Sequence, residues 1–333
     1  MIPALPEWQG LEERRAACLL GGAVGDAFGY PVEFLDRSAI RARFGRKGIR
    51  EPQATREGRL RVSDDTQMTL FTLEGLLRGF RTGDITGEIR RAYLDWLDTQ
   101  GEAAEGVEPA GTLARERVLR VRRAPGATCL TALADQGGRG TPQQPLNHSK
   151  GCGGVMRVAP IGLFPERFST PEAFRLGVEA AALTHGHPSG YLSAGALCAV
   201  LRELLAGGGL VDAAARAIAE LGAWEGREET VGRMENALEL AARGGGDVAT
   251  LGLGWTGEEA LAIGLYAALA GAGFTGSLAI AANHDGDSDS TASIAGQIYG
   301  AWKGMSAIPR QWVGALDLLG PMLGLIAQSN AGG

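Results

Sequence analysis

The stretch SDDTQMTLFTLEGLLRGF at residues 63–80 decides the fold class of this chain. After its acidic opening, apolar residues recur every three or four positions, at Leu70, Leu73, Leu76, Leu77 and Phe80. This spacing places them on one face of a helix, because an α-helix has 3.6 residues per turn. We therefore expect a helix that begins near Thr66 and packs its apolar face into a core.

The same helical period runs through most of the chain, and alternating, strand-like runs are nearly absent. Further helices are expected over residues 11–25, 86–98, 112–123, 171–184, 188–206, 210–221, 228–243, 257–270, 290–303 and 311–325. The stretches 45–62, 99–111 and 135–154 are expected to be loops, and loops of this length are often functional. Since no repeat or change of composition marks a boundary, we predict one compact all-α domain over residues 1–333.

The composition is that of a folded globular protein, with 45% hydrophobic and 21% charged residues. The formal net charge of −6 argues against a nucleic acid recruited by the overall charge, although a local basic groove stays open. Four scattered cysteines without a CxxC pair indicate neither a disulfide framework nor a structural zinc site. With no targeting segment recognised, we expect a cytoplasmic monomer.

One uncharged segment, residues 260–283, has the length of a membrane span. Gly271, Gly273 and Gly276 divide it, however, so we expect two buried helices joined by a glycine turn and no membrane partner.

Two acidic clusters lie far apart in the chain. Asp64 and Asp65 follow Ser63 at the start of a helix, where acidic residues also act as caps. The second cluster, HDGDSDST at residues 284–291, contains Asp285, Asp287 and Asp289, whose carboxylates repel one another unless cations neutralise them. Carboxylate and hydroxyl oxygens suit Mg²⁺ or Mn²⁺ better than Zn²⁺. The sequence therefore indicates a magnesium site, with a solvated acidic turn as the alternative.

Other metal and nucleotide motifs fit less well. An EF-hand needs Gly at the position of Ser290 and Glu at that of Gly296, and the DDxxD motif of isoprenoid synthases needs Asp at Met68. The GLGWTG pattern at 252–257 lacks the alternating βα units of a dinucleotide fold. For His185 and His187, which have no third zinc ligand nearby, substrate contact or helix capping is favoured over zinc.

Two glycine-rich segments add candidate site residues. In GGAVGDAFGYPVEF, residues 21–34, Asp26 and Glu33 share a helix face if the helix continues; if it breaks at Gly29 or Pro31, Glu33 lies on a loop, either pointing into a site or exposed. In NHSKGCGGVMR, residues 147–157, backbone amides could form an anion nest, with Lys150 or Arg157 near the phosphate; an ordinary loop is the alternative.

Taken in order, these segments resemble the ADP-ribosylglycohydrolase family from about residue 14 to residue 303. Five separate motifs carry the resemblance: GDAFGYPVEF, SDDTQMTL, GCGGVMRVAPIGLF, THGHP and GDSDSTASIAGQIYGA. The resemblance implies an all-α fold with a binuclear metal cleft, in which two Mg²⁺ ions, with Mn²⁺ as a substitute, face the ribose of an ADP-ribosyl group. The implied reaction is hydrolysis of the glycosidic bond between ADP-ribose and a modified protein side chain, nucleic acid or small metabolite.

Residue roles follow from the resemblance position by position. The implied metal ligands are Ser63, Asp64, Asp65, Asp287, Asp289 and Ser290. The groups implied in catalysis are Glu33, as general acid or base, with Asp65 and Asp287. Substrate contacts are implied for Gly151, Gly153 and Gly154, around the diphosphate, and for His185.

The sequence departs from the family pattern at a few positions. Ser63 and Ser290 stand where Thr is common, which keeps the hydroxyl, and Asp285-Gly286 stands where Gly-Gly is frequent. Two alternatives stay open: a catalytically silent ADP-ribose-binding member of the fold, and a magnesium hydrolase of another ribosyl or phosphorylated metabolite. The linkage that is cleaved also stays open.

Overall fold

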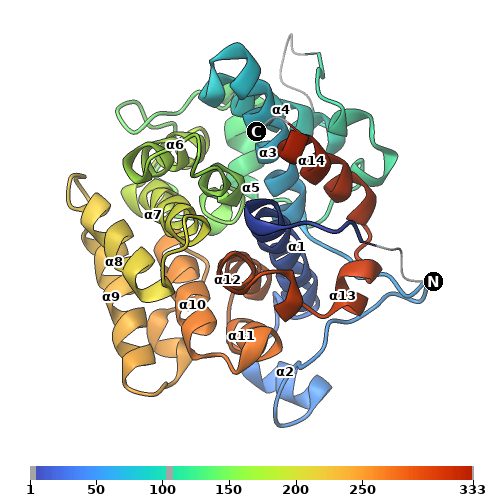
Figure 1. Ribbon diagram of the computed structural model, residues 1–333, viewed down its shortest axis with the longest axis vertical. Coiled ribbons are helices and arrows are strands. Elements are labelled where there is room, and N and C mark those ends of the chain that lie inside the picture. The colour runs from blue at the N-terminus through green and yellow to red at the C-terminus, as the bar shows by residue number, and fades with distance from the viewer. Residues whose placement is uncertain (1–4, 103–107, 332–333) are drawn as a thin grey trace.

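The computed structural model describes residues 5–102 and 108–331, and helices are its only regular elements (Figure 1). Within these two ranges there is no β-strand, only isolated β-bridges, so the predicted all-α class is confirmed. The α-helices are α1 Gly10–Gly29, α2 Arg37–Phe44, α3 Asp64–Thr82, α4 Ile85–Thr99, α5 Ala127–Gln136, α6 Thr170–Ala182, α7 Pro188–Leu205, α8 Leu210–Leu221, α9 Glu228–Ala242, α10 Gly257–Ala270, α11 Gly273–Ala282, α12 Ser288–Lys303, α13 Arg310–Ala315 and α14 Leu319–Ala331.

The prediction of a helix over residues 112–123 is wrong. The segment forms two short 3₁₀ turns, Leu113–Arg115 and Arg117–Leu119, and the α-helix of this region is α5. The segment is held by side chains of α3 instead. Gln67 Nε2 donates to Leu119 O and Val121 O, at 3.3 and 3.0 Å, so these carbonyls are bound by another helix. The Glu74 carboxylate of α3 accepts the backbone N–H groups of Thr112 and Leu113 at the start of the segment, at 2.6 and 3.1 Å.

Two further differences concern short helices. Helix α2 was not expected, because its sequence RSAIRARF buries only Ile40; the Asp36 side chain caps its start by accepting the Ala39 N–H. The single helix expected over 311–325 is divided into α13 and α14. Leu60 interrupts it by donating its N–H to Ala315 O and accepting the Asp317 N–H. The expected loop 99–111 lies partly outside the described residues.

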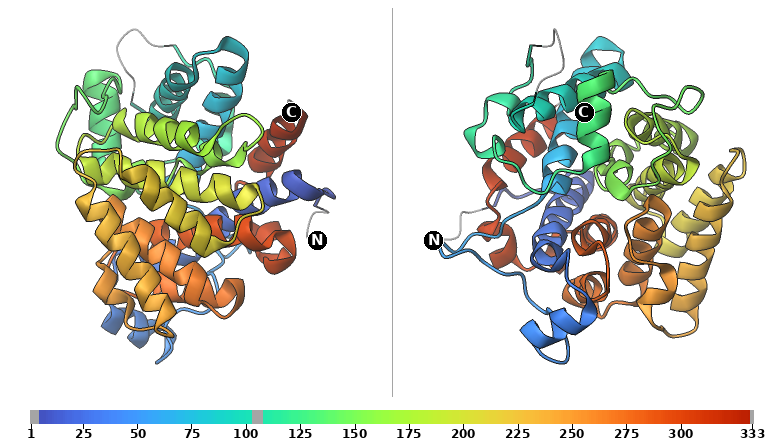
Figure 2. Two further views of the ribbon diagram at one scale, coloured as in Figure 1. Left: turned by 60° about the vertical axis from the view of Figure 1, so that its left-hand side comes forward. Right: turned by 180° about the vertical axis from the view of Figure 1, so that it is seen from behind.

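Helices α1 and α12 form the centre of the molecule, with α3 and α4 on one side and α6, α7 and α10 on another (Figures 1 and 2). The backbones of α1 and α12 touch each other because glycine lies at the contact. A Cβ built on Gly25 would lie 2.0 Å from Ala292 O, and one on Gly29 would lie 2.0 Å from Ser288 O. Because α1 ends at Gly29 and α12 begins at Ser288, this packing brings the end of α1 to the start of α12.

The uncharged segment 260–283 forms α10 and α11, as expected. Among the described helices, none combines the length and the hydropathy needed to cross a membrane. The four cysteines, all of them within the described ranges, are free thiols.

Candidate active site

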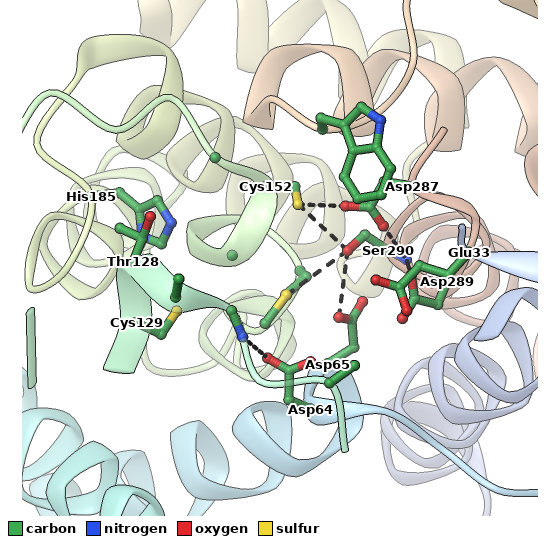
Figure 3. A pocket seen from close by; sticks show the side chains of 17 residues that line it. Glu33, Asp64, Asp65, Thr128, Cys129, Cys152, His185, Asp287, Asp289 and Ser290 are labelled. Carbon is green, nitrogen blue, oxygen red and sulfur yellow. Dashed lines mark hydrogen bonds between the residues drawn. The ribbon is translucent and has the colours of Figure 1, made fainter. Parts of the chain in front are cut away.

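The two acidic clusters meet in one pocket (Figure 3). Asp64 and Asp65 reach it from the start of α3, Asp287 and Asp289 from the start of α12, and the Ser290 hydroxyl lies 3.4 Å from Asp65 Oδ1. The convergence expected from the sequence is therefore present. The pocket is lined by Glu33, Asp64, Asp65, Ala124, Gly126, Ala127, Thr128, Cys129, Gly151, Cys152, Gly153, Met156, His185, Trp255, Asp287, Asp289 and Ser290.

The pocket is strongly acidic. Glu33 and four aspartates line it, and no Lys or Arg does so within the part of the chain that is described. Burial raises the pKa of Glu33 to about 9, with the charges of Asp287 and Asp64 adding to the effect. Burial and the neighbouring Asp26 likewise raise the pKa of Asp64 to about 8. Ionised carboxylates in this pocket thus need a counter-charge from outside the protein.

The donor set suits divalent cations. Glu33 Oε2 and Asp65 Oδ2 are buried, and neither has a hydrogen-bond partner among the described residues. Buried polar atoms are normally paired, so these two oxygens are free to serve as ligands, and oxygen is the donor that Mg²⁺ prefers. No three Asp, Glu, His or Cys side chains of the described residues already surround one point as ion ligands do. Cation binding would therefore require carboxylates to turn toward the ion.

The first cluster is positioned from behind by Asp26 of α1. Its fully buried carboxylate accepts the Ser63 N–H at 2.8 Å and the Thr66 N–H at 3.1 Å, which fixes the first turn of α3. The Ser63 hydroxyl accepts the Asp65 N–H at 3.2 Å, as an N-cap. Ser63 does not line the pocket, so the structure places this implied ligand one layer behind Asp64 and Asp65.

Glu33 lies where the chain leaves α1. The helix ends at Gly29 and continues as a 3₁₀ turn, Tyr30–Val32, which Glu33 follows. Of the two arrangements considered from the sequence, the broken helix is the observed one. The side chain is not an exposed loop carboxylate: Glu33 is 8% exposed and lies on the pocket wall beside Asp289 (Figure 3).

The second cluster is ordered by its own helix and by a thiol. Asp287 is the N-cap of α12 and accepts the Ser290 N–H at 3.2 Å, while its other oxygen accepts the Cys152 thiol at 2.7 Å. Asp285 stays outside the pocket, where it accepts the Arg37 N–H at 2.6 Å. The three carboxylates of HDGDSDST are therefore not equivalent: two face the pocket and one supports α2.

The glycine-rich loop and His185 form the opposite wall (Figure 3). Gly151 and Gly153 line the pocket, and a Cβ on Gly153 would lie 3.0 Å from the His185 ring. Gly154 does not line it; it packs beneath, where a Cβ would lie 2.7 Å from Gly190 O. His185 accepts or donates a 2.8 Å hydrogen bond with the Thr184 hydroxyl through Nδ1. Burial and Arg157 lower its pKa to about 3, so the ring is neutral.

Two amides of the loop for which an anion nest was suggested already have acceptors within the protein. The Gly151 N–H donates to Ser149 Oγ and the Cys152 N–H to Trp255 O, so both amides are occupied. Neither suggested cation reaches the pocket. Lys150 pairs with Glu229 at the surface, at 2.7 Å. Arg157 is fully buried, donates to Thr184 Oγ1 at 2.7 Å and lies over the Tyr93 ring, where it supports His185 through Thr184.

The second histidine of the pair caps a helix. His187 is the N-cap of α7, and its Nδ1 accepts the Ser189 N–H at 3.1 Å. Capping, one of the two roles favoured for the pair from sequence, is confirmed at this position.

Several pocket residues were not identified from the sequence. Cys152 stands within the glycine-rich motif but shows no spacing that predicts its contact with Asp287. Trp255 belongs to GLGWTG, which was considered only as a nucleotide motif. Ala124 lines the pocket at a φ of 54°, which is unusual for a residue with a side chain. Aromatic residues and strained backbone at a pocket edge carry no periodic signal, so only the fold reveals them.

The fold and the pocket define an all-helical protein in which acidic side chains from distant helix ends face one cavity. Comparison with known proteins agrees with this class. The chain belongs to the ADP-ribosylglycohydrolase family, whose model matches residues 7–329. It is thus a member of a family of glycohydrolases.

Two individual proteins are similar over nearly their whole length. An uncharacterized protein of Archaeoglobus fulgidus (strain ATCC 49558 / DSM 4304 / JCM 9628 / NBRC 100126 / VC-16) is 28% identical over 323 residues, 92% of each chain. A solved structure described as an ADP-ribosylglycohydrolase-related protein complex superposes with a TM-score of 0.65 and 26% sequence identity, covering 96% of this chain and 98% of that chain. The resemblance drawn from the five motifs is confirmed at the level of the family.

Proposed function

We propose that this chain hydrolyses the glycosidic bond between ADP-ribose and a modified target, with two Mg²⁺ ions held in the acidic pocket. The observation that carries the proposal is the meeting of Glu33 with the Asp64–Asp65 and Asp287–Asp289 pairs around one cavity. Family membership supports a glycohydrolase, and the charge of the pocket supports a cation-dependent one.

The ligands of the proposed ions are Asp64, Asp65, Asp287, Asp289 and Ser290, which face the pocket, with Ser63 orienting Asp65 from behind. Two bound Mg²⁺ ions would offset the charge of these carboxylates and polarise the ribose hydroxyls. The unpartnered oxygens of Asp65 and Glu33 favour this interpretation over a set of helix caps, since a cap is satisfied by its own helix.

The proposed general base is Glu33. Cations bound in the pocket would offset the charges of Asp287 and Asp64 that raise its pKa, and would so favour the ionised carboxylate. Its Oε2, buried and without a hydrogen-bond partner in the described chain, then accepts a proton from the water that attacks the ribose anomeric carbon. As the new carbon–oxygen bond forms, the bond from that carbon to the target breaks, and the departing atom takes up the proton that Glu33 received from the water, which restores the Glu33 carboxylate. The neutral His185 ring and the small Gly151 and Gly153 leave room on the opposite wall for the sugar and diphosphate.

Calorimetry and a release assay test the metal site. The wild-type chain is titrated with Mg²⁺ and then with ADP-ribose, and release of ADP-ribose from a panel of modified arginine, serine, nucleic-acid and small-molecule substrates is followed with Mg²⁺ or with EDTA. The D64N/D65N double variant is expected to lose both Mg²⁺ binding and turnover. D285N, which removes a carboxylate two residues from the pocket, is the matched control and is expected to keep both. Full activity of the double variant in EDTA would refute the site.

A second variant tests the role of Glu33. E33Q is expected to bind ADP-ribose with unchanged affinity and to lower turnover at least about tenfold, since a positioned acid or base contributes roughly 10²–10⁴ in rate. The exposed E51Q serves as control. Unchanged turnover in E33Q would remove Glu33 from the mechanism, and binding of ADP-ribose by the wild type without turnover on any substrate would instead identify a silent member of the fold.

A further inference from the structure

A concentrated positive charge lies directly after the residue that we place in the mechanism. Residues 37–61, called here the basic segment, contain nine Lys or Arg and two Glu, a net charge of +7 in a chain whose total is −6. The overall charge, which argued against a nucleic-acid partner, therefore conceals a strongly basic region between Glu33 and Asp64.

Most of these cations are free to meet a ligand. Four are exposed on α2 and the turn after it: Arg41, Arg43, Arg46 and Lys47. Four more are exposed along the following loop: Arg50, Arg56, Arg59 and Arg61. None of the eight forms an ion pair within residues 5–102 and 108–331. Arg37, which pairs with Asp247 and contacts Asp285, anchors the segment instead.

The first part of the basic segment, as far as Ile49, is fixed to the turn that precedes the second acidic cluster. The Asn283 side chain accepts the Ile49 N–H and donates to Ile49 O, both at 2.9 Å. Asn283 stands only four residues before Asp287, so this part of the basic segment is bound close to the second acidic cluster in the chain. Figure 1 shows α2 beside α11, which ends just before Asn283. Arg41, Arg46 and Lys47 surround a small surface hollow here, with no carboxylate among its described lining residues.

Two exposed aromatic rings form a pair at the pocket edge, and one of them stands three residues before the basic segment. Phe34 directly follows Glu33 and is 74% exposed, and its ring stacks on Trp255, with 5.9 Å between centroids and 21° between planes. Trp255 is 40% exposed and lines the pocket. Two large rings exposed to water leave apolar surface unburied, which is unfavourable for the free energy of the folded chain. The same exposure makes the flat faces of the rings available to a ligand.

We propose that the basic segment and the Phe34–Trp255 pair bind a single-stranded nucleic acid that carries the ADP-ribosyl group to be removed. A row of unpaired cations follows a phosphate backbone, and exposed aromatic rings stack on unpaired bases; together they are the two elements of single-strand recognition. An acidic pocket repels a phosphate chain, so the cations outside it are needed to hold such a substrate. An acidic peptide would use the cations but not the stacked rings, and an anionic membrane, whose interface also accepts aromatic rings, is one of the probes of the test below.

Binding is measured without turnover, so that the test does not depend on the proposed hydrolysis. Fluorescence anisotropy follows a labelled single-stranded DNA of about 12 nucleotides, within the usual site size of such proteins, in EDTA and over a range of salt concentrations. We expect the affinity to fall as the salt concentration rises. The logarithm of the association constant plotted against the logarithm of the salt concentration should have a slope of about −0.7 for each phosphate contact.

Charge reversal tests the cations. R46E/K47E is expected to weaken binding at least about tenfold and to reduce the salt slope by about 1.4, or 0.7 for each lost contact. The control R81E/R216E changes the total charge equally at exposed positions on α3 and α8, and its affinity is expected to stay within about twofold of the wild type. Equal weakening by both double variants would overturn the proposal, because the net charge alone would then govern binding.

Ring substitution tests the stacking. F34L keeps an apolar side chain but removes the ring, and should weaken DNA binding at least about fivefold, whereas F34Y should bind as the wild type does. A polyglutamate peptide of equal charge and anionic phosphatidylserine vesicles are the competing probes. If either binds as tightly as the DNA, or if F34L binds DNA as well as F34Y, the single-strand proposal fails.

Turnover then separates this inference from the proposed function. R46E/K47E is expected to lower kcat/KM on an ADP-ribosylated oligonucleotide and to leave it unchanged on a small ADP-ribosylated compound. If R46E/K47E turns over both substrates as the wild type does, the docking role is overturned and the proposed hydrolase activity still stands.

Discussion

The acidic pocket makes the stability of the cation-free chain depend on pH in a defined direction. Burial raises the pKa of Asp64 to about 8 and that of Glu33 to about 9, well above the values of these groups in an unfolded chain. The folded state therefore binds more protons than the unfolded state between about pH 4 and pH 9. The stabilising contribution of these protons is present below about pH 4 and is lost as the pH rises through the folded-state pKa values.

The size of the effect follows from the same values. From pH 6, the folded-state pKa of Asp64, about 8, lies about 2 pH units higher and that of Glu33, about 9, about 3 pH units higher, and each such unit corresponds to about 1.4 kcal/mol. Because the groups repel one another, their contributions do not add, and a total loss on the order of 3–6 kcal/mol is expected. For a chain of this length the entropy of unfolding is about 0.7 kcal/mol per kelvin, so the melting temperature should fall by about 4–9 °C.

Thermal unfolding in EDTA and in excess Mg²⁺, between about pH 6 and pH 9, measures this effect. We expect a falling melting temperature in EDTA and a smaller slope in Mg²⁺, because bound cations favour the ionised carboxylates. D64N removes one of the repelling charges and should raise the melting temperature at the alkaline end in EDTA, whereas D285N, whose carboxylate lies outside the pocket, should not. A melting temperature independent of both pH and Mg²⁺ would refute the reasoning.

Three further predictions concern the packing and the pocket wall. G25A should lower the free energy of unfolding by at least about 2 kcal/mol, measured in urea, because its Cβ would lie 2.0 Å from Ala292 O; G324A, where a Cβ meets no described atom within 4 Å, should change it by no more than about 1 kcal/mol. The Glu74 carboxylate accepts the Thr112 and Leu113 amides, so E74A should speed the hydrogen exchange of both amides, whereas E116A should leave it unchanged. The His185 imidazole, whose pKa is lowered to about 3, should show no NMR titration between about pH 5 and pH 8, and a midpoint near 6.5 would contradict its burial.

The helical class could be predicted because it has a local signal, and the meeting of the acidic clusters could be predicted because the five motifs together resemble one family. Leu70, Leu73 and Leu76 repeat at the helical period, and each acidic cluster immediately precedes or opens a helix. The motifs could say that Asp65 and Ser290 belong to one site. They could not say that the Ser63 hydroxyl caps α3, since the cap depends on where the Asp65 N–H lies in the folded chain.

The remaining differences arise from long-range partners that no window of sequence contains. The 112–123 segment has apolar residues at helical spacing, yet the Gln67 side chain of α3 takes the carbonyls of Leu119 and Val121. Likewise, a single helix was expected to continue through Leu316, but Leu60 forms backbone hydrogen bonds with Ala315 and Asp317 on either side of this residue. The pairing of Phe34 with Trp255 joins residues more than two hundred positions apart, and neither belongs to a repeating pattern.

The close packing of α1 on α12 links these observations to the site. Gly25 and Gly29 let the two helices touch through their backbones, and α1 ends where α12 begins. The same contact therefore sets the position of Glu33, just past α1, relative to Asp287 and Asp289. A larger residue at Gly29 would push the Glu33 turn away from the carboxylates as well as weaken the core. Glycine at these positions is thus required by the geometry of the pocket as much as by the stability of the fold.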